Sequence, residues 1–106
     1  MRSNPDKSYT PPLVVATTNN QPNTLKVLLS LDLVEVNDTS HSGKSALYVA
    51  SEHGHTTCAQ LLIAHGAQIG VVTSHCRNAL HAAVEHNHVS TFELLCKHAT
   101  VNDITL

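Results

Sequence analysis

The chain repeats itself with a period of 33 residues. The stretch S-A-L-Y-V-A-S at 45–51, followed by E-H-G-H, returns as N-A-L-H-A-A-V at 78–84, followed by E-H-N-H. A fixed period of this size is typical of repeat proteins, in which each unit packs on its neighbours along the chain. The identical residues at this offset include eight pairs: Leu47 and Leu80, Ala50 and Ala83, Glu52 and Glu85, His53 and His86, His55 and His88, Leu61 and Leu94, Leu62 and Leu95, and His65 and His98.

The repeat divides the chain into three units. We expect a polar leader at 1–5 and one domain at 6–106, with units at about 6–39, 40–72 and 73–104; the first is a weaker copy that contains T-P-P-L-V-V-A at 10–16. Apolar spacing and turn residues predict two short helices in each unit. The predicted helices are 12–18, 23–31, 46–53, 58–65 with a cap at Thr56 or Thr57, 79–86, and a last one that opens at Ser90 or Thr91.

In the second and third units, we expect a polar N-cap residue before the first helix and a left-handed residue after it. Ser45 and Asn78 precede the apolar runs and are suitable N-caps, because their side-chain oxygens can accept from an unpaired helix N–H. Gly54 and Asn87 follow the runs, where a left-handed residue commonly ends a helix. The two later units therefore share one local design.

Helices of about two turns are not stable alone in water, so they must bury their faces against neighbouring units. Aromatic residues make up only 3% of the chain, which predicts an aliphatic core. In the second unit we expect Leu47, Ala50, Ser51, Cys58, Leu61 and Leu62 to face inward. In the third unit we expect the same of Leu80, Ala83 and Val84. The second helix of that unit carries Phe92, Leu94, Leu95 and Cys96, with the Cys96 thiol expected on its apolar face.

The pattern resembles the ankyrin repeat family over roughly residues 6–102. The family motif T-P-L-H-x-A-A corresponds to 45–51 and 78–84, and its G-H to Gly54-His55 and Asn87-His88. The resemblance implies an all-α ankyrin-repeat solenoid of three stacked helix-turn-helix units with short β-hairpin-like finger loops. It also implies a module that binds other proteins and has no catalytic activity. Cys76 departs from the pattern, because it stands where the family has a turn glycine.

The same resemblance implies where a partner protein binds, at the finger tips and late on the first helix of each unit. In the second unit these positions are His41, Ser42, Lys44, Glu52 and His53. In the third unit they are Ser74, His75, Arg77, Glu85 and His86. The matching positions of the first unit are Lys7, Ser8, Thr10, Thr18 and Asn19.

Nine histidines, including H-x-H at 53–55 and 86–88, raise the hypothesis of a metal site. Zinc–nitrogen distances of about 2.0–2.1 Å bring ligand nitrogens close together, whereas packed helices lie roughly 8–10 Å apart. We therefore predict no metal and no cofactor. His55, His81 and His88 are expected to be buried, so that charging them in acid would destabilise the stack. No nucleophile or phosphate-binding motif is present, and an enzyme is not predicted.

Composition narrows the other function classes. The formal net charge is −2 and 13% of residues are charged, which argues against nucleic-acid binding and a polybasic membrane patch. No apolar run approaches the ~20 residues that span a bilayer, and the first ten residues lack a signal peptide's apolar segment. Three cysteines form no paired framework, and Cys76 is the candidate surface thiol. We expect reduced thiols and an intracellular protein, cytoplasmic or nuclear.

Two functional hypotheses remain open at this point. The first is a protein-binding adaptor that uses the positions above. The second is a structural fragment or spacer of a longer array, with binding carried elsewhere. A terminal repeat normally has a polar outer face, but the C-terminal end carries Phe92, Leu94, Ile104 and Leu106. We expect that end to associate with another copy or to meet further repeats.

Overall fold

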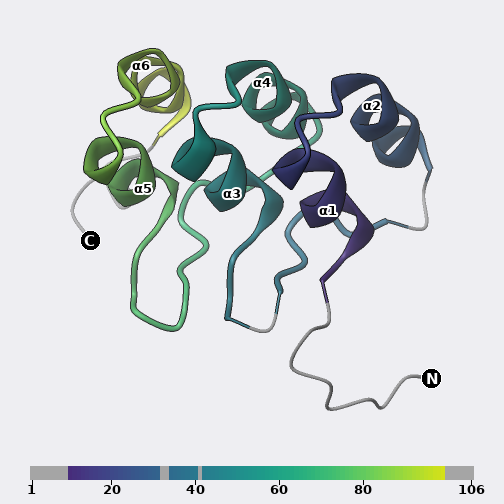
Figure 1. Cartoon of the computed structure of the whole chain (residues 1–106), viewed down its shortest axis with the longest axis horizontal. Helices are drawn as coiled ribbons and strands as arrows, with labels where there is room; N and C mark the ends of the chain where they lie inside the picture. The colour runs from purple at the N-terminus through teal and green to yellow at the C-terminus, as the bar shows by residue number, and fades with distance from the viewer. Residues whose placement is uncertain (1–9, 32–33, 41, 100–106) are drawn as a thin grey trace.

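A computed structural model describes residues 10–31, 34–40 and 42–99. Its helices form three antiparallel pairs that stand side by side in chain order (Figure 1). The first helices of the units make one layer, in which α3 lies between α1 and α5, and the second helices make another, in which α4 lies between α2 and α6. The helices are α1 Pro12–Thr18, α2 Pro22–Ser30, α3 Ala46–His53, α4 Thr56–Ala64, α5 Ala79–Glu85 and α6 Val89–His98.

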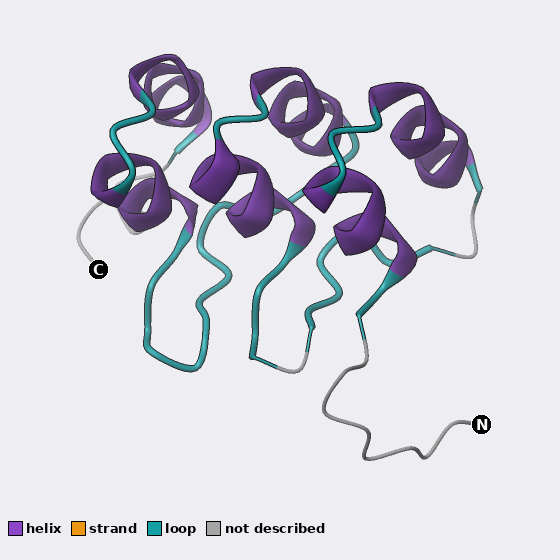
Figure 2. Cartoon of the chain, viewed as in Figure 1, coloured by secondary structure: helices purple, strands orange, loops and turns teal. Residues whose placement is uncertain are grey.

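The predicted all-α solenoid of three stacked helical pairs is confirmed. Long loops connect each pair to the next, and in the described ranges these finger loops contain no strand (Figure 2). A single antiparallel bridge, between Thr39 and Ser45, closes the base of the first described finger. The leader at 1–5 lies outside the described residues, and the unit boundaries stay a prediction.

The predicted caps of the first helices are confirmed. The Ser45 hydroxyl accepts from the Tyr48 N–H at 3.2 Å. Asn78 Oδ1 accepts from the His81 N–H at 3.2 Å, and His81 Nδ1 accepts from the Asn78 N–H at 3.0 Å. The two bonds between Asn78 and His81 form a capping box in which histidine takes the place of the usual Glu or Gln.

The predicted caps of the second helices are wrong. α4 begins at Thr56 after His55 and α6 at Val89 after His88, and neither histidine makes a capping bond. Left-handed Gly54 and Asn87 each precede one of these histidines, so each second helix begins two residues after the left-handed residue. The hydroxyls expected to cap have another use, because Thr56 Oγ1 and Thr91 Oγ1 bond to each other across the two units at 2.9 Å.

The core is aliphatic, as predicted, and runs through all three units. Leu13, Leu25, Leu47, Leu62 and Leu95 are each at most 1% exposed. Cys58 is also buried, which raises the pKa of its thiol, and its Sγ lies 3.7 Å from Asn20 Oδ1 of the first unit.

Two inward assignments in the third unit are wrong. Val84 is 61% exposed, and Cys96 is exposed as well. Both lie on the side of α5 and α6 that no described element covers, whereas Phe92 and Leu94 are partly buried against the core. Exposed Cys76, by contrast, matches its predicted place at the surface, and it takes a left-handed φ of 62°. No described helix is long and apolar enough to cross a bilayer.

Gly54 has both a conformational and a spatial reason to be glycine. Its φ is +72°, and a Cβ there would lie 2.6 Å from His88 Nδ1. Gly66 has a φ of +91°, but no atom of the described residues lies within 4 Å of the position that a Cβ would take there. It is therefore a matched control for backbone strain alone.

We expect Gly66→Ala to lower the free energy of unfolding by about 1–2 kcal/mol, the usual cost of a left-handed L-residue. Gly54→Ala should cost more, because the new methyl group also displaces the His88 ring. Urea unfolding at equilibrium measures both. In a His88→Ala background, Gly54→Ala should cost no more than Gly66→Ala, because the ring that the methyl group displaces is gone. Equal losses at the two glycines would contradict the contact with His88.

Candidate functional site

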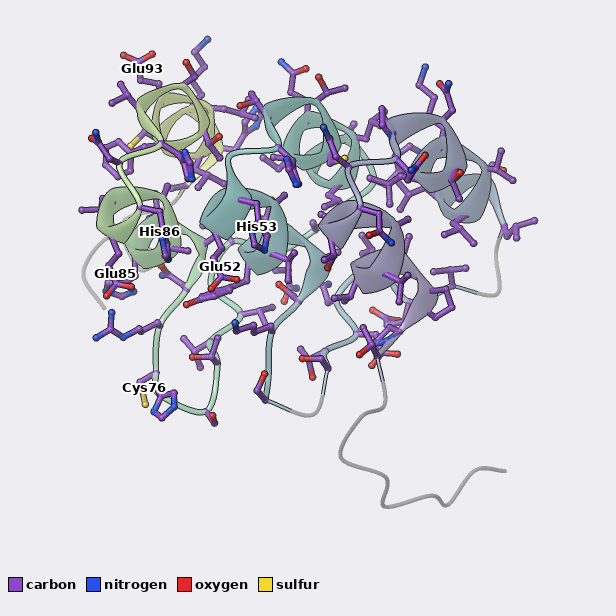
Figure 3. All side chains as sticks on the ribbon, viewed as in Figure 1. Glu52, His53, Cys76, Glu85, His86 and Glu93 are labelled. Atoms are coloured by element: carbon purple, nitrogen blue, oxygen red, sulfur yellow. The ribbon has the colours of Figure 1, made fainter. Side chains whose placement is uncertain are left out.

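The ten predicted binding residues gather on one side of the fold, except His41, which lies outside the described residues. Figure 3 shows Glu52 and His53 over α3, Glu85 and His86 over α5, and the finger loops below them. Of the first-unit positions, Thr10, Thr18 and Asn19 are described and exposed, whereas Lys7 and Ser8 are outside the described ranges. We call the nine described residues of the later units the loop-helix surface: Ser42, Lys44, Glu52, His53, Ser74, His75, Arg77, Glu85 and His86.

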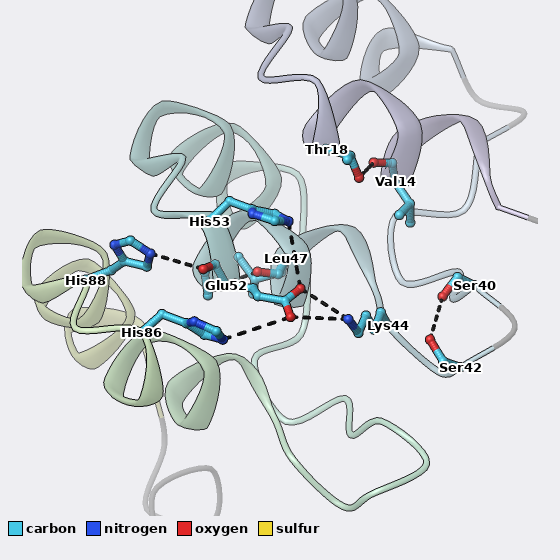
Figure 4. A network of polar contacts seen from close by, with 11 residues as sticks. Val14, Thr18, Ser40, Ser42, Lys44, Leu47, Glu52, His53, His86 and His88 are labelled. Carbon is cyan, nitrogen blue, oxygen red and sulfur yellow. Dashed lines mark hydrogen bonds and ion pairs between the residues drawn. The ribbon is translucent and has the colours of Figure 1, made fainter.

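Glu52 is the centre of the contacts on this surface (Figure 4). Lys44 Nζ lies 3.2 Å from Glu52 Oε2 and 3.3 Å from Oε1. His53 Nε2 lies 3.9 Å from Oε1, and His86 Nε2, which belongs to the next unit, lies 4.0 Å from Oε2. One carboxylate therefore faces one lysine ammonium group and two imidazole rings. Sequence reasoning selected each of these residues but did not foresee that they converge.

The third unit repeats the first of these contacts, because Arg77 forms an ion pair with Glu85. In both units the cation directly precedes the N-cap, and the carboxylate lies in the last turn of the first helix. The side chains are 37% and 20% exposed in the Lys44–Glu52 pair and 46% and 41% in the Arg77–Glu85 pair. Ion pairs this accessible to water contribute roughly 0–1 kcal/mol to stability, so the pairs are not needed to hold the fold.

The second histidine of each H-x-H motif links neighbouring units. His88 Nε2 donates to the Glu52 carbonyl oxygen at 3.0 Å, and His55 makes the equivalent bond to the Thr18 backbone. The rings stack in pairs, His53 on His55 with centroids 5.6 Å apart and His86 on His88 at 6.3 Å. In the described chain, no three His, Cys, Asp or Glu side chains gather closely enough to hold a metal ion.

The expected burial of these histidines is only partly met. His55, His81 and His88 are half-buried, not buried. Burial nevertheless lowers the pKa of His55, and nearby His53 lowers it further, against the opposing effect of the bond to the Thr18 backbone.

The finger loops are also tied to each other. The Ser74 N–H donates to the Ser42 carbonyl oxygen at 3.2 Å. Within the third-unit finger, Thr73 Oγ1 accepts from the backbone N–H of His75 at 3.2 Å. The first bond holds the two fingers against each other, and the second holds the third-unit finger in its turn. Thr73 was not selected from the sequence, since its role depends on the loop conformation.

The chain is similar to known proteins at two levels, a family model and individual relatives. The family model described as ankyrin repeats, three copies, matches residues 13–105. Cortactin-binding protein 2 of Ornithorhynchus anatinus is 42% identical over 45 residues, which is 42% of this chain. The match spans only 3% of the length of that relative.

The lowered pKa of His55 sets a direction for the effect of pH on stability. The unfolded chain takes up the proton near pH 6.5, whereas the folded chain resists it to lower pH. Folding is therefore favoured above pH 6.5 and loses stability as the pH falls through 6.5 toward the lower folded pKa.

We expect a lower thermal midpoint at pH 5.5 than at pH 7.5, measured by circular dichroism. His55→Gln should reduce that difference, because Gln cannot titrate and Gln21 already holds the equivalent position in the first unit. A midpoint that is unchanged or higher in acid would contradict the expectation, as would an undiminished difference in the variant.

Proposed function

Because this chain belongs to the ankyrin repeat family, we propose that it binds a partner protein along the loop-helix surface. Ankyrin repeats are generally protein-interaction modules, and the family is generally non-catalytic. The proposal adds to this the residues that carry the binding. It also places the protein in a reducing compartment, the cytoplasm or nucleus, a view supported by three unpaired cysteines of which two are exposed.

The observation that carries the proposal is the repetition of one exposed ion pair in two successive units. Lys44 with Glu52 and Arg77 with Glu85 occupy the same positions 33 residues apart, and both pairs remain partly open to solvent. The pairs contribute little to the fold, so they are available to exchange their partners. Charged groups arranged in this way supply specificity and register more than bulk affinity.

The chemistry of this surface suggests what kind of partner segment it accepts. Two cations and two carboxylates balance, so the four charged side chains have no net charge at neutral pH. A complementary segment would present an acidic group to Lys44 or Arg77 and a hydrogen-bond donor to Glu52 or Glu85. Exposed His53 and His86 offer ring faces and further donors beside each carboxylate.

The relative described above supplies one partner to test first. Its name says that it binds cortactin. The matched stretch is so small a share of that protein that its cortactin site need not fall within the match. Cortactin is therefore a candidate for this chain that needs direct measurement.

We expect a quadruple variant, Glu52→Ala, His53→Ala, Glu85→Ala and His86→Ala, to lose partner binding while it keeps its fold. The immobilised chain would be challenged with purified cortactin and, separately, with cell extract analysed by mass spectrometry. Proteins retained by the wild type should fall at least tenfold in the variant. Circular dichroism and thermal unfolding check that the variant remains folded, with a loss of no more than about 1–2 kcal/mol from the two pairs.

The matched control changes four exposed residues of α4 and α6 that also lie at equivalent positions of the same two units. These substitutions are Thr57→Ala, Gln60→Ala, Ser90→Ala and Glu93→Ala. Glu93 lies at the top of Figure 3, far from the finger loops. Binding that survives in the surface variant but is lost in this control would refute the site. A wild-type chain that retains no protein would favour the spacer hypothesis.

A further inference from the structure

The two ends of the stack expose faces that are buried at the internal junctions. The trailing face is the outer side of α5 and α6, with Leu80, Val84 and Phe92. The leading face is the outer side of α1 and α2, with Val15 and Val27. They lie at opposite ends of the row of helical pairs (Figure 1).

The side chains of the trailing face occupy positions that a following helical pair covers in the first two units. Val84 is 61% exposed, whereas the residues at the same position of the first two units, Thr17 and Ser51, are 0% exposed beneath the following unit. Leu80, Val84 and Phe92 line an apolar cavity of about 280 Å³. A side chain from a following helical pair would fill this cavity.

On the leading face, a residue of α1 is exposed at a position that the preceding unit covers in the later units. Val15 is 44% exposed, but its equivalents Val49 and Ala82 are 4% and 0% exposed against the preceding unit.

On α2, Val27 is 61% exposed. Its equivalent in the third unit, Leu94, lines the gap between α6 and α4 together with Gln60 and Ile63. Val27 therefore points outward from the stack along the direction in which a preceding unit would lie.

One hydrogen bond of the internal junctions also has its donor position at the leading end of the stack and its acceptor position at the trailing end. At the internal junctions, His55 and His88 bond to a backbone group at the end of the preceding unit's first helix. Gln21 occupies this position in the first unit and is exposed, with an amide that can donate. The Glu85 carbonyl, in the position of Glu52, is the acceptor that a neighbouring Gln21 would reach.

We propose that a second copy of this chain docks head to tail, with the leading face of one copy on the trailing face of the other. Every copy carries both faces. At the internal junctions, the residues at leading-face positions of one unit cover the residues at trailing-face positions of the unit before it. The contact continues the internal junctions by one more step. It is heterologous, so it does not close into a symmetric dimer and leaves one face open at each end of the assembly.

The test combines two variants, each with one face blocked by a charge. Val84→Glu blocks the trailing face and Val27→Glu the leading face, and both side chains are already 61% exposed, so the fold should tolerate them. In sedimentation experiments from micromolar to millimolar concentration, the wild-type mass should rise from 11.4 kDa past twice that value. Each variant alone should remain a monomer. An equal mixture should form a dimer, because each variant supplies the face that the other lacks.

Thr57→Glu, on the exposed side of α4, is the matched control and should assemble as the wild type does. Circular dichroism confirms that all variants are folded. A wild type that stays monomeric throughout the range overturns the proposal. So does a closed dimer that Val84→Glu abolishes and Val27→Glu leaves intact, since that pattern means two trailing faces in symmetric contact. Association that persists in both variants, or that is lost in the control, places the interface elsewhere.

Discussion

Burial between neighbouring helical pairs is the interaction on which the rest of the structure depends. The helices are seven to ten residues long, too short to persist alone. In α3, which has a neighbour on both sides, the six residues from Ala46 to Ser51 are all buried. In α6, at the end of the row, the buried residues are Thr91 and Leu95. Burial therefore depends on the row of helical pairs, and it decreases at the end of the row.

A second set of contacts sets the spacing of the units. The His88 ring reaches the Glu52 backbone, Thr56 meets Thr91, and the Cys58 thiol approaches Asn20. Each contact joins side chains or backbone of adjacent units, so it depends on their separation and rotation. Apolar packing alone tolerates small slips, whereas directional bonds between half-buried groups do not. Together they give the finger loops and helix ends a defined arrangement.

The repeat made most of the fold predictable, because residues at matched positions of two units have the same structural surroundings and so give two observations of each position. Leu47 with Leu80 and Ser45 with Asn78 were assigned correctly for this reason. Val84 was assigned wrongly because inward and outward on a solenoid depend on whether another pair covers that side, which helical spacing does not encode. The cap proposed at Thr56 or Thr57 failed because α4 already begins directly after His55, and the Thr56 hydroxyl bonds to Thr91 of the next unit. The meeting of Lys44 with Glu52 depends on the path of the finger loop, and the local sequence does not specify that path.

The Glu52 carboxylate is shared between the second and third units. It faces Lys44 from its own loop, His53 from its own helix and His86 from the following unit. A group of the proposed partner that pairs with this carboxylate would compete with Lys44 of the second unit and with His86 of the third. Under the proposed binding mode, the contributions of the second and third units to the affinity are therefore expected to be non-additive.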